Sequence, residues 1–196
     1  MGVIIKTVSG NAIQPYIPDL ARLRMDIFRD FPYLYEGSAA YEEGYLATYL
    51  RSEETVMVLV IDGSRVVGAS SGMPMEMETN AVTRPFLEAG MSTANIFYFG
   101  ESLLYSPYRG KGIGHKFFDE REKHARASGT FIITAFCAVQ RPTTHPLRPK
   151  GYQPLDAFWE KRGYTRRPDL MTTFQWQDIG EKEETEKPMM FWIRKW

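Results

Sequence analysis

The chain has 196 residues, of which 43% are hydrophobic and 14% are aromatic, so a single domain spanning 1–196 can build a real core. Its 24 basic residues balance 24 acidic ones, and no extended basic run is present, which argues against nucleic acid as a partner. No apolar run approaches the roughly 18 residues of a membrane span, and the first residues lack a signal-peptide pattern. Cys137 is the single cysteine, so no internal disulfide forms, and we expect a cytoplasmic protein with no membrane partner.

The first half of the chain predicts one strand, two helices and a β-hairpin. β-Branched residues open the chain, as is typical of a strand, and Pro18 indicates the start of a helix that ends at Pro32. Ser38 is a candidate N-cap for a second helix, and Asp62-Gly63 is a hairpin turn signal. The predicted elements are a strand at 3–8, helices at 17–31 and 39–51, and strands at 55–61 and 65–71.

Two segments of this half allow more than one interpretation. The aromatic link 31–37 is either a loop packed on the core, which is the safer interpretation, or a wall of a binding pocket. The stretch 73–93 is rich in methionine and has a turn signal at Arg84-Pro85. Its methionines fill irregular apolar space or adapt to a bound molecule, and core filling is at least as well supported.

A strand, a glycine-rich turn and a helix follow one another in the middle of the chain. An apolar run from Ile96 to Tyr105 is interrupted by Gly100-Glu101 and stops at Ser106-Pro107. A helical pattern then extends to a stop signal at Gly129. Its apolar side holds Ile113, Phe117, Phe118 and Ala125, and its charged side holds Lys116, Asp119, Glu120, Glu122, Lys123 and Arg126.

The turn at 109–115 is suited to a diphosphate. The first amides of a helix lack internal partners and carry the positive end of its dipole, and glycines let a phosphate approach them. Arg109 and Lys111 add positive charge. A Walker loop is excluded because Gly112 stands where a Ser or Thr is needed, and the dinucleotide fingerprint fails because its third glycine would fall on His115 or Phe117.

The last third of the chain predicts three strands and a short helix. The run 131–139 is continuously apolar, as in a strand covered on both faces, and Cys137 within it reads as a buried small residue rather than a nucleophile. An irregular segment, 140–153, follows with three prolines and three basic residues. The remaining elements are a helix at 154–162 and strands at 171–177 and 189–196.

Two motifs carry a resemblance to a known family. Tyr108-Arg109-Gly110-Lys111-Gly112-Ile113-Gly114 contains R-x-x-G-x-G and resembles the acetyl-coenzyme A motif of the GNAT superfamily of N-acetyltransferases. Phe158 to Tyr164 resembles that family's late helix and the glycine–aromatic pair after it. The element order is similar to the GNAT fold over nearly the whole chain. The expected fold class is therefore α/β (α+β), with a mixed, mostly antiparallel seven-stranded sheet flanked by about four helices.

The resemblance implies acetyl-coenzyme A (acetyl-CoA) as co-substrate and no metal. The family splays two neighbouring parallel strands and holds the pantetheine arm between them. Carried over to this chain, strand amides bind the arm, the turn binds the pyrophosphate, and two aromatic residues flank the thiol end. The implied cofactor-binding residues are Leu103, Leu104, Tyr105, Arg109, Gly110, Lys111, Gly112, Ile113, Gly114, His115, Phe158 and Trp159.

Glu101 is the candidate catalytic base. An acceptor amine must lose a proton before it attacks the thioester, and a charge inside an apolar strand is costly without a task or partner. A salt-bridged or edge-facing glutamate is an equally good interpretation. The family's usual acid, a tyrosine, is replaced by Trp159, and its frequent asparagine corresponds to Gln153. Tyr105 and Tyr152 are substitutes, and a thiol with pKa near 8.5 can also leave without an acid.

The expected function is an N-acetyltransferase that moves the acetyl group to a primary amine by direct attack in a ternary complex. The acceptor, a small molecule or a peptide, cannot be read from the sequence. Transfer of a longer acyl group and a non-catalytic acyl-CoA sensor are alternatives, and a homodimer built on the aromatic final hairpin is a third option. The basic segment 140–153 faces an acidic acceptor, the 3′-phosphate of coenzyme A, or solvent, and solvent is favoured.

Overall fold

Eight strands form one mixed sheet in the computed structural model, which describes residues 2–196. The strand order is β1–β2–β3–β4–β6–β8–β7, and β5 pairs with β3 beside this path. Neighbouring strands are antiparallel except β4 and β6, which are parallel. The strands are β1 (Ile4–Val8), β2 (Val56–Asp62), β3 (Arg65–Pro74), β4 (Ile96–Tyr98), β5 (Ser102–Leu104), β6 (Ile133–Val139), β7 (Thr165–Trp176) and β8 (Thr185–Lys195).

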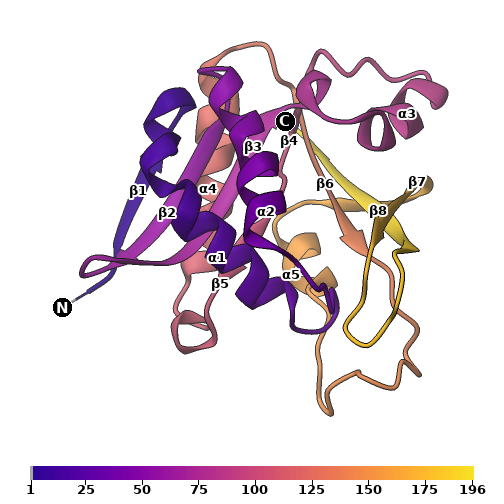
Figure 1. Cartoon of the computed structure of the whole chain (residues 1–196). Coiled ribbons are helices and arrows are strands. Elements are labelled where there is room, and N and C mark those ends of the chain that lie inside the picture. The colour runs from indigo at the N-terminus through magenta and orange to yellow at the C-terminus, as the bar shows by residue number, and fades with distance from the viewer. Residues whose placement is uncertain (1) are drawn as a thin grey trace.

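Five α-helices lie on the two faces of this sheet. Figure 1 shows α1 and α2 in front of β1, β2 and β3, with α4 behind them. The helices are α1 (Ile17–Phe28), α2 (Ala39–Leu46), α3 (Asn80–Glu88), α4 (Ile113–Ala127) and α5 (Asp156–Lys161). None of the helices within residues 2–196 has both the length and the apolar character needed to cross a bilayer. The predicted class is confirmed, with one strand and one helix more than expected.

The extra strand arises because the apolar run 96–105 is split by a bulge. Met73 of β3 pairs with Tyr98 of β4, and Ser70 of β3 pairs with Ser102 of β5. Residues 71 and 72 of β3 therefore lie opposite three residues, 99–101, that connect β4 to β5. The amides of Gly100 and Glu101 both point at Ser71, at 3.2 Å from its carbonyl and 3.1 Å from its hydroxyl. A Cβ on Gly100 would lie 2.6 Å from the Ser71 hydroxyl, so this position requires glycine.

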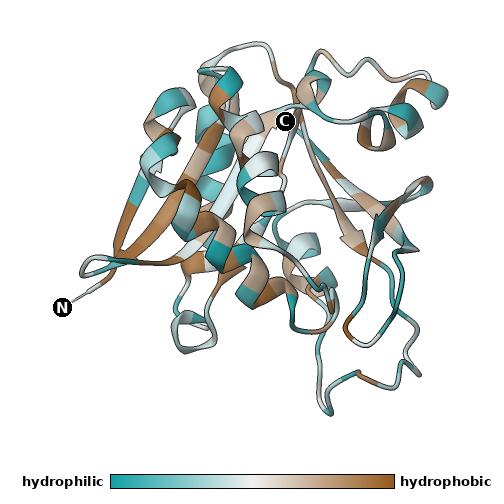
Figure 2. Cartoon of the chain, viewed as in Figure 1, coloured by the Kyte–Doolittle hydropathy of each residue, from teal (hydrophilic) through white to brown (hydrophobic). Residues whose placement is uncertain are grey.

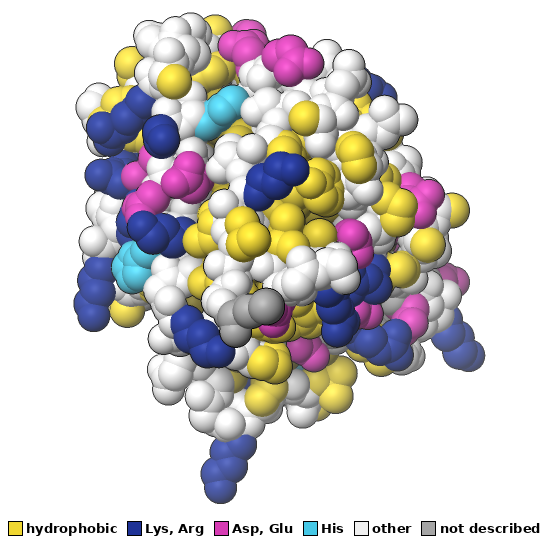
Figure 3. Space-filling view, turned by 90° about the vertical axis from the view of Figure 1, so that its left-hand side faces the viewer, with side chains coloured by type: hydrophobic (Ala, Val, Ile, Leu, Met, Phe, Trp, Pro, Cys, Tyr) yellow, Lys and Arg dark blue, Asp and Glu magenta, His cyan; other side chains and the backbone are white. Residues whose placement is uncertain are grey.

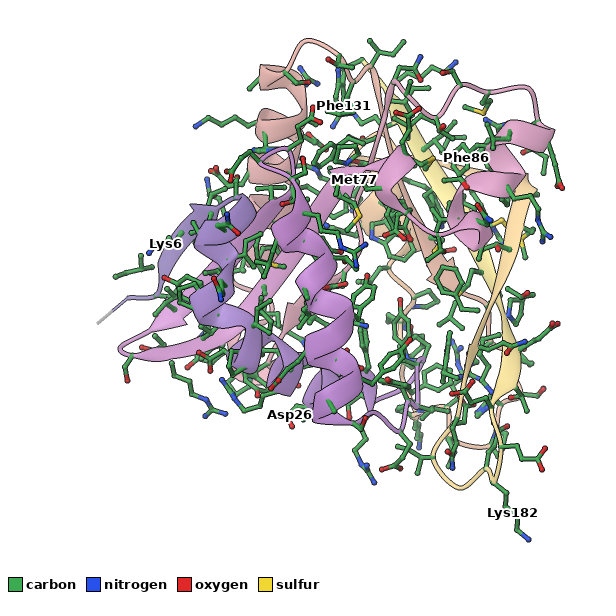
Figure 4. The ribbon with its side chains drawn as sticks, turned by 45° about the horizontal axis from the view of Figure 1, so that its top comes forward. Lys6, Asp26, Met77, Phe86, Phe131 and Lys182 are labelled. Atoms are coloured by element: carbon green, nitrogen blue, oxygen red, sulfur yellow. The ribbon has the colours of Figure 1, made fainter. Side chains whose placement is uncertain are left out.

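The extra helix, α3, forms where a turn at Arg84-Pro85 was expected, so that prediction was wrong. Pro85 lacks an N–H and leaves the carbonyl of Ala81 without its helical donor. The hydroxyl of Thr172 on β7 donates to that carbonyl at 2.6 Å, which compensates for the missing bond. Phe86 then packs on Phe191 of β8, with ring centroids 4.8 Å apart. Figure 4 labels Phe86 on this helix, beside the β7–β8 end of the sheet.

The hydrophobic core lies on both faces of the sheet. One cluster joins β2 and β4 to α4 through residues such as Val58, Phe97 and Phe117. A second joins the opposite face to α1 and α2, and a third joins α3 to β6, β7 and β8. Figure 2 shows the hydrophobic colour along β2 and the hydrophilic colour on the β7–β8 loop. Burial of both sheet faces explains why β2 and β6 read as continuous apolar runs.

The final hairpin is longer than the predicted strands 171–177 and 189–196. β7 begins at Thr165, and its register shifts where the residues between Arg167 and Met171 have no partner on β8. Pro168 lies in this irregularity and hid the first part of the strand from the sequence pattern. Trp176, Phe191 and Trp192 of the hairpin are buried within the chain. These three aromatics therefore serve the core, and the homodimer stays a prediction.

The sheet ends at β1, whose outer edge has no strand neighbour within the described residues. Figure 3 shows this side of the molecule, with hydrophobic side chains in its middle and Lys and Arg around them. Ile4 is 63% exposed here. Lys6, in the same strand, donates to the hydroxyl of Tyr16 at 2.8 Å, and a lysine on an edge strand opposes pairing with another chain.

Glu122 is buried, although its helical position predicted a solvated side chain. It accepts hydrogen bonds from Arg194 at 3.0 Å, Arg162 at 3.0 Å and the hydroxyl of Tyr164 at 3.2 Å. These partners come from β8, from the residue after α5 and from the residue before β7. The carboxylate therefore fastens α4 to the elements that carry the late helix.

Candidate active site

The parallel strands β4 and β6 separate at the bulge and open a cavity between them. They pair only at 96–98 with 133–135, and the Phe99 amide makes one more bond, to Ala135 at 2.8 Å. Beyond this point β5 pairs with β3 alone. A cavity of about 1180 Å³ fills the gap and is lined by residues on both sides of it. Its walls include Phe99, Gly100, Glu101, Ser102 and Leu104 on one side, and Phe136, Cys137, Ala138, Val139 and Gln140 on the other.

The predicted cofactor-binding residues divide into those that line this cavity and those that do not. The lining ones are Leu104, Arg109, Gly110, Gly112, Gly114, His115, Phe158 and Trp159. Leu103 and Ile113 are buried in the core instead. The ammonium of Lys111 lies 5.6 Å from the centre of the Tyr108 ring, and Tyr105 donates its hydroxyl hydrogen to Asp26.

The turn before α4 presents five free backbone amides in succession. Within residues 2–196 the amides of 110–114 donate no hydrogen bond, whereas the amide of Arg109 donates to Ser106 and that of His115 to Gly112. Gly110 and Gly112 hold φ of 74° and 80°, which favours glycine. A Cβ at either would meet nothing within 4 Å, so the space beside the amides is open. Free amides at a helix N-terminus form an anion site.

The strand amides beside the gap are not equivalent. The Tyr105 amide donates to the Val67 carbonyl at 3.1 Å and is therefore not available to a ligand. Because amide direction alternates along a strand, the Leu103 amide also points toward β3 and the Leu104 amide points into the gap. The carbonyl of Leu104 accepts a hydrogen bond from Arg109 Nε at 2.9 Å, which places that guanidinium beside the same opening.

Glu101 lies at the bulge and is both cavity-lining and salt-bridged. Its Oε2 accepts a hydrogen bond from Arg24 Nη1 at 2.7 Å, and its side chain is only 5% exposed. Burial raises the pKa of Glu101 and the neighbouring Glu42 carboxylate adds to the rise, while Arg24 opposes it. The salt-bridged interpretation of Glu101 is therefore confirmed, and its role as catalytic base stays a prediction.

The partners of Glu101 come from the two front helices and were not anticipated from the sequence. Arg24 of α1 lies between Glu101 and the fully buried Glu42 of α2, and it pairs with both carboxylates. Burial lowers the pKa of Arg24, but Glu101, Tyr45 and Glu42 outweigh that effect and raise it. One feature of the sequence could have indicated that Arg24 is buried: it lies four residues after Leu20 and therefore on the apolar side of α1.

A second arginine supports the bulge from the α4 side. Arg121 is 1% exposed and forms no ion pair within residues 2–196. Its Nη1 donates to the carbonyls of Ser71 at 3.1 Å and Glu101 at 3.2 Å, and its Nη2 donates to the hydroxyl of Ser102 at 2.9 Å. Burial lowers the pKa of Arg121 to about 10. The guanidinium therefore holds the backbone that presents Glu101.

Cys137, Trp159, Tyr152 and Gln153, which the sequence analysis singled out, all line the cavity. The Cys137 thiol lies 3.1 Å from the Tyr98 hydroxyl, and burial raises its pKa to about 12, so it stays a neutral thiol. Trp159 packs on Phe136, with ring centroids 5.0 Å apart. Tyr152 lines the cavity, as does Gln153. No group of three or more His, Cys, Asp or Glu in the described chain is arranged to hold a metal ion.

No protein-family model and no curated protein matches the sequence. Solved structures are similar to the chain in fold, at low identity. Ribosomal-protein-alanine N-acetyltransferase from Brucella melitensis aligns with a TM-score of 0.63 at 15% identity, over 98% of this chain and 99% of its own. An acetyltransferase of the GNAT family from Streptococcus pneumoniae aligns at 0.59 and 13%, over 99% of both chains.

A third similar structure is an aminoglycoside 6′-N-acetyltransferase complexed with coenzyme A. It aligns with a TM-score of 0.55 at 16% identity, over 98% of this chain and 96% of its own. All three alignments extend over nearly the whole length of both chains, as the sequence resemblance predicted. The chain has the fold of the GNAT N-acetyltransferases.

Proposed function

We propose that the protein is an N-acetyltransferase that moves an acetyl group from acetyl-CoA to a primary amine by direct attack in a ternary complex. One observation carries the proposal: a single cavity between splayed strands is lined both by glycines of the free-amide turn, Gly110, Gly112 and Gly114, and by the buried carboxylate of Glu101. The coenzyme A complex of a structurally similar enzyme supports the choice of donor. We expect no metal to be required.

The donor would be held mainly by the backbone. The amides of 110–114 suit the pyrophosphate, and Arg109 adds charge beside them. The Leu104 amide is the strand donor that faces the gap, so it is our choice to bind the pantetheine arm or the thioester carbonyl. Phe158 and Trp159 form an apolar wall on the same cavity. Lys111 and Ile113 would contribute through their backbone amides, whereas Leu103 and Tyr105, whose amides point toward β3, would contribute to shape rather than to direct contact.

Glu101 is our candidate base. An amine must be neutral to attack, and a carboxylate whose pKa is raised accepts a proton more readily at neutral pH than an ordinary one. The new C–N bond forms as the C–S bond breaks, the proton from nitrogen goes to Glu101 directly or through water, and the sulfur leaves as thiolate. Tyr152, which lines the cavity, is the remaining candidate to protonate that sulfur.

Calorimetric titration with acetyl-CoA and a thiol-release screen of amines test this function. We expect binding, and we expect Glu101→Gln to bind acetyl-CoA as the wild type does while its kcat falls by about 10²- to 10⁴-fold. The wild-type rate should rise with pH through the raised pKa of Glu101, because only the ionised form accepts a proton. An unchanged pH–rate profile in Glu101→Gln would remove Glu101 from the role of base.

A non-catalytic acyl-CoA sensor is the second candidate, because Trp159 stands where the family usually has its acidic tyrosine. The indole packs against Phe136 and Trp192 and has no acidic proton to give. Tight binding of acetyl-CoA without turnover on any amine would favour the sensor. Turnover that is faster with propionyl- or butyryl-CoA than with acetyl-CoA would favour a longer acyl donor.

A further inference from the structure

The segment between β6 and α5 brings positive charge to the cavity without any acidic residue of its own. Residues 140–155 include Arg141, Arg148 and Lys150 but no Asp or Glu. Arg141 and Arg148 line the cavity, and Arg166 at the start of β7 lines it as well. The sequence favoured solvation for this segment, whereas the structure places these two arginines of the segment at the cavity wall.

Arg141 has a structural task. It forms an ion pair with Asp178 at 2.7 Å and donates to the carbonyls of Pro32 at 2.8 Å and Tyr33 at 2.7 Å. These bonds tie the α1–α2 link to the segment after β7. The hydrogen-bonding capacity of Arg141 is therefore used within the chain.

Arg148 differs, because it has aromatic support but no carboxylate partner. No carboxylate among residues 2–196 forms an ion pair with it. Its guanidinium carbon lies 4.8 Å from the centre of the Tyr152 ring and 5.8 Å from that of Phe31, and the only hydrogen bond it donates within the described chain is a long one, 3.4 Å, to the Tyr152 carbonyl. A half-buried guanidinium held by two rings is pre-organised to receive an anion.

Arg148 lies in a part of the cavity away from the amide turn that we propose for the pyrophosphate of the donor. Phe31, against which it packs, belongs to the α1–α2 link. The amide turn at 109–115 lies elsewhere: in Figure 1 the turn before α4 is at the lower left and the segment between β6 and α5 is at the lower right. Arg166 extends the positive wall, since the only hydrogen bond that its side chain donates within the described residues goes to the amide oxygen of Gln140 at 3.2 Å.

We infer that the acceptor is an amine that also carries a carboxylate, with Arg148 binding the carboxylate while the amino group reaches Glu101. This inference rests on the proposed function, because it names the acceptor class of the same site. Charge arrangement supports it: the carboxylate base and the unpaired guanidinium line one cavity, so an acceptor of both charges is complementary to both. Free amino acids and peptides with a terminal or side-chain carboxylate share this chemistry.

Matched acceptors test the inference in the wild-type protein. Thiol release is measured with ω-amino acids of increasing chain length and with their carboxamides, and with short peptides that end in a carboxylate or an amide. We expect kcat/KM to favour the carboxylate of the matching pair by about tenfold to a hundredfold, as for a hydrogen bond to a charged group. The small-molecule and peptide arms identify which source is preferred. Equal rates for every carboxylate and carboxamide pair would overturn the inference without any variant.

Two variants then test whether Arg148 is the residue responsible for the carboxylate preference. Arg148→Met keeps the apolar stem and should abolish the carboxylate preference by raising KM for the carboxylate acceptors. Lys150→Met removes a neighbouring charge that does not line the cavity, and it should retain the full preference. A preference that survives in Arg148→Met would overturn the assignment of this residue.

The 3′-phosphate of coenzyme A is the competing anion, and it is tested by binding alone. Affinities for coenzyme A and for 3′-dephospho-coenzyme A are compared in the wild type and in Arg148→Met. We expect both affinities to be unchanged by the substitution. A loss confined to coenzyme A would show that Arg148 binds the cofactor and would overturn the inference. Absence of turnover on every amine would instead contradict the proposed transferase itself, which separates the two failures.

Discussion

One arginine balances two buried carboxylates beside the cavity. Arg24 lies between Glu42 and Glu101, and no second cation forms an ion pair with either carboxylate within residues 2–196. Removal of one member of such a group is far more costly than the net worth of the pair, because it leaves unpaired charge in a poorly solvated place. The protonation of Glu101 therefore depends on a residue that does not itself line the cavity.

Arg24→Met should lower the free energy of unfolding by about 3–5 kcal/mol, because Glu42 and Glu101 lose their shared cation. It should also move the rising limb of the rate–pH profile to higher pH, since Arg24 lowers the pKa of Glu101. Urea unfolding and the profile measure the two effects. Arg29→Met is the control: its ion pair with Glu36 is about half exposed, so the loss should stay below about 1 kcal/mol. Equal losses in the two variants would contradict the buried-pair account.

Glu78 predicts a pH dependence of stability. Burial raises the pKa of Glu78 to about 7, so the folded chain holds this proton at pH values at which the unfolded chain has released it. The stabilising contribution is complete below the unfolded pKa and is lost as pH rises through about 7. Melting temperatures at pH 5 and pH 8 should differ less in Glu78→Gln than in the wild type. The exposed neighbour variant Glu76→Gln should keep the wild-type difference, and a flattened response there would contradict this assignment.

The sequence identified Glu101 but not its partners, for a physical reason. A charged residue inside an apolar strand can be recognised from the sequence alone, because its burial is costly wherever the strand lies in the fold. Arg24 and Glu42 are separated from Glu101 by 77 and 59 residues, and their pairing depends on how two helices dock on the sheet. Arg121 was missed because nothing in an amphipathic helix pattern distinguishes a buried arginine from a solvated one.

At the scale of elements, the site depends on how one helix begins. α4 starts at Ile113, after a glycine with left-handed φ and with no side chain capping its first amides. An N-cap side chain would normally satisfy one of those donors. Within residues 2–196 the amides of 110–114, two of them at the start of α4, have no acceptor, so a bound anion can supply one.

Gly112→Ala should weaken acetyl-CoA binding and also lower stability by about 1–2 kcal/mol, because a Cβ is strained at φ of 80°. Gly129→Ala is a matched control at the other end of α4. Gly129 has φ of 72°, its Cβ would likewise meet nothing within 4 Å, and it does not line the cavity. Thermal unfolding should show similar losses in the two variants, and calorimetry should show weaker binding in Gly112→Ala alone. Equal affinities in the two variants would contradict the assignment of the pyrophosphate to the amides of 110–114.

The order of the elements and the glycine-rich turn could be predicted from the sequence, whereas the helix that contains Pro85 and the effect of the bulge could not. Strong apolar periodicity and turn signals identified α1, α2, α4 and most strands. α3 was missed because Pro85 reads as a helix breaker, and the compensating hydroxyl of Thr172 is 87 residues away in sequence. The bulge at Gly100-Glu101 was seen as an interruption, but its consequence, a gap beside β6, requires knowledge of which strands are neighbours.

At the scale of the whole molecule, the cavity divides the sheet into two parts with few connections. β4 pairs with β3 at two positions and with β6 at three. On the other side of the cavity the α1–α2 link reaches across, through hydrogen bonds such as Glu36 to Gln177 at 3.0 Å and Ile179 to Leu34 at 2.7 Å. Acetyl-CoA bound in the gap would connect the two parts of the sheet, in addition to the β4 pairing and the α1–α2 link.

Acetyl-CoA should therefore stabilise the molecule most strongly along the gap. At a ligand concentration of about 100 Kd the linkage contribution is about 2.7 kcal/mol, and the melting temperature should rise accordingly. Hydrogen exchange followed by mass spectrometry should show the largest slowing at 102–104 and 110–114, with β1 and β2 least affected. Uniform slowing along the chain, or none at the turn, would contradict the proposed placement.

The bulge has one more consequence, which concerns the face of the sheet to which each side chain of 96–105 points. Before it, the odd-numbered Phe97 and Phe99 face the α4 cluster; after it, the even-numbered Leu104 does so and the odd-numbered Leu103 faces α1 and α2. The single additional residue exchanges the two faces. If the same residues alternated regularly along one strand, Glu101 would share the side of Phe99 and point at α4, away from Arg24. The irregular pairing at 99–101 therefore sets the direction of this carboxylate, toward Arg24, and the order of polar and apolar residues alone does not.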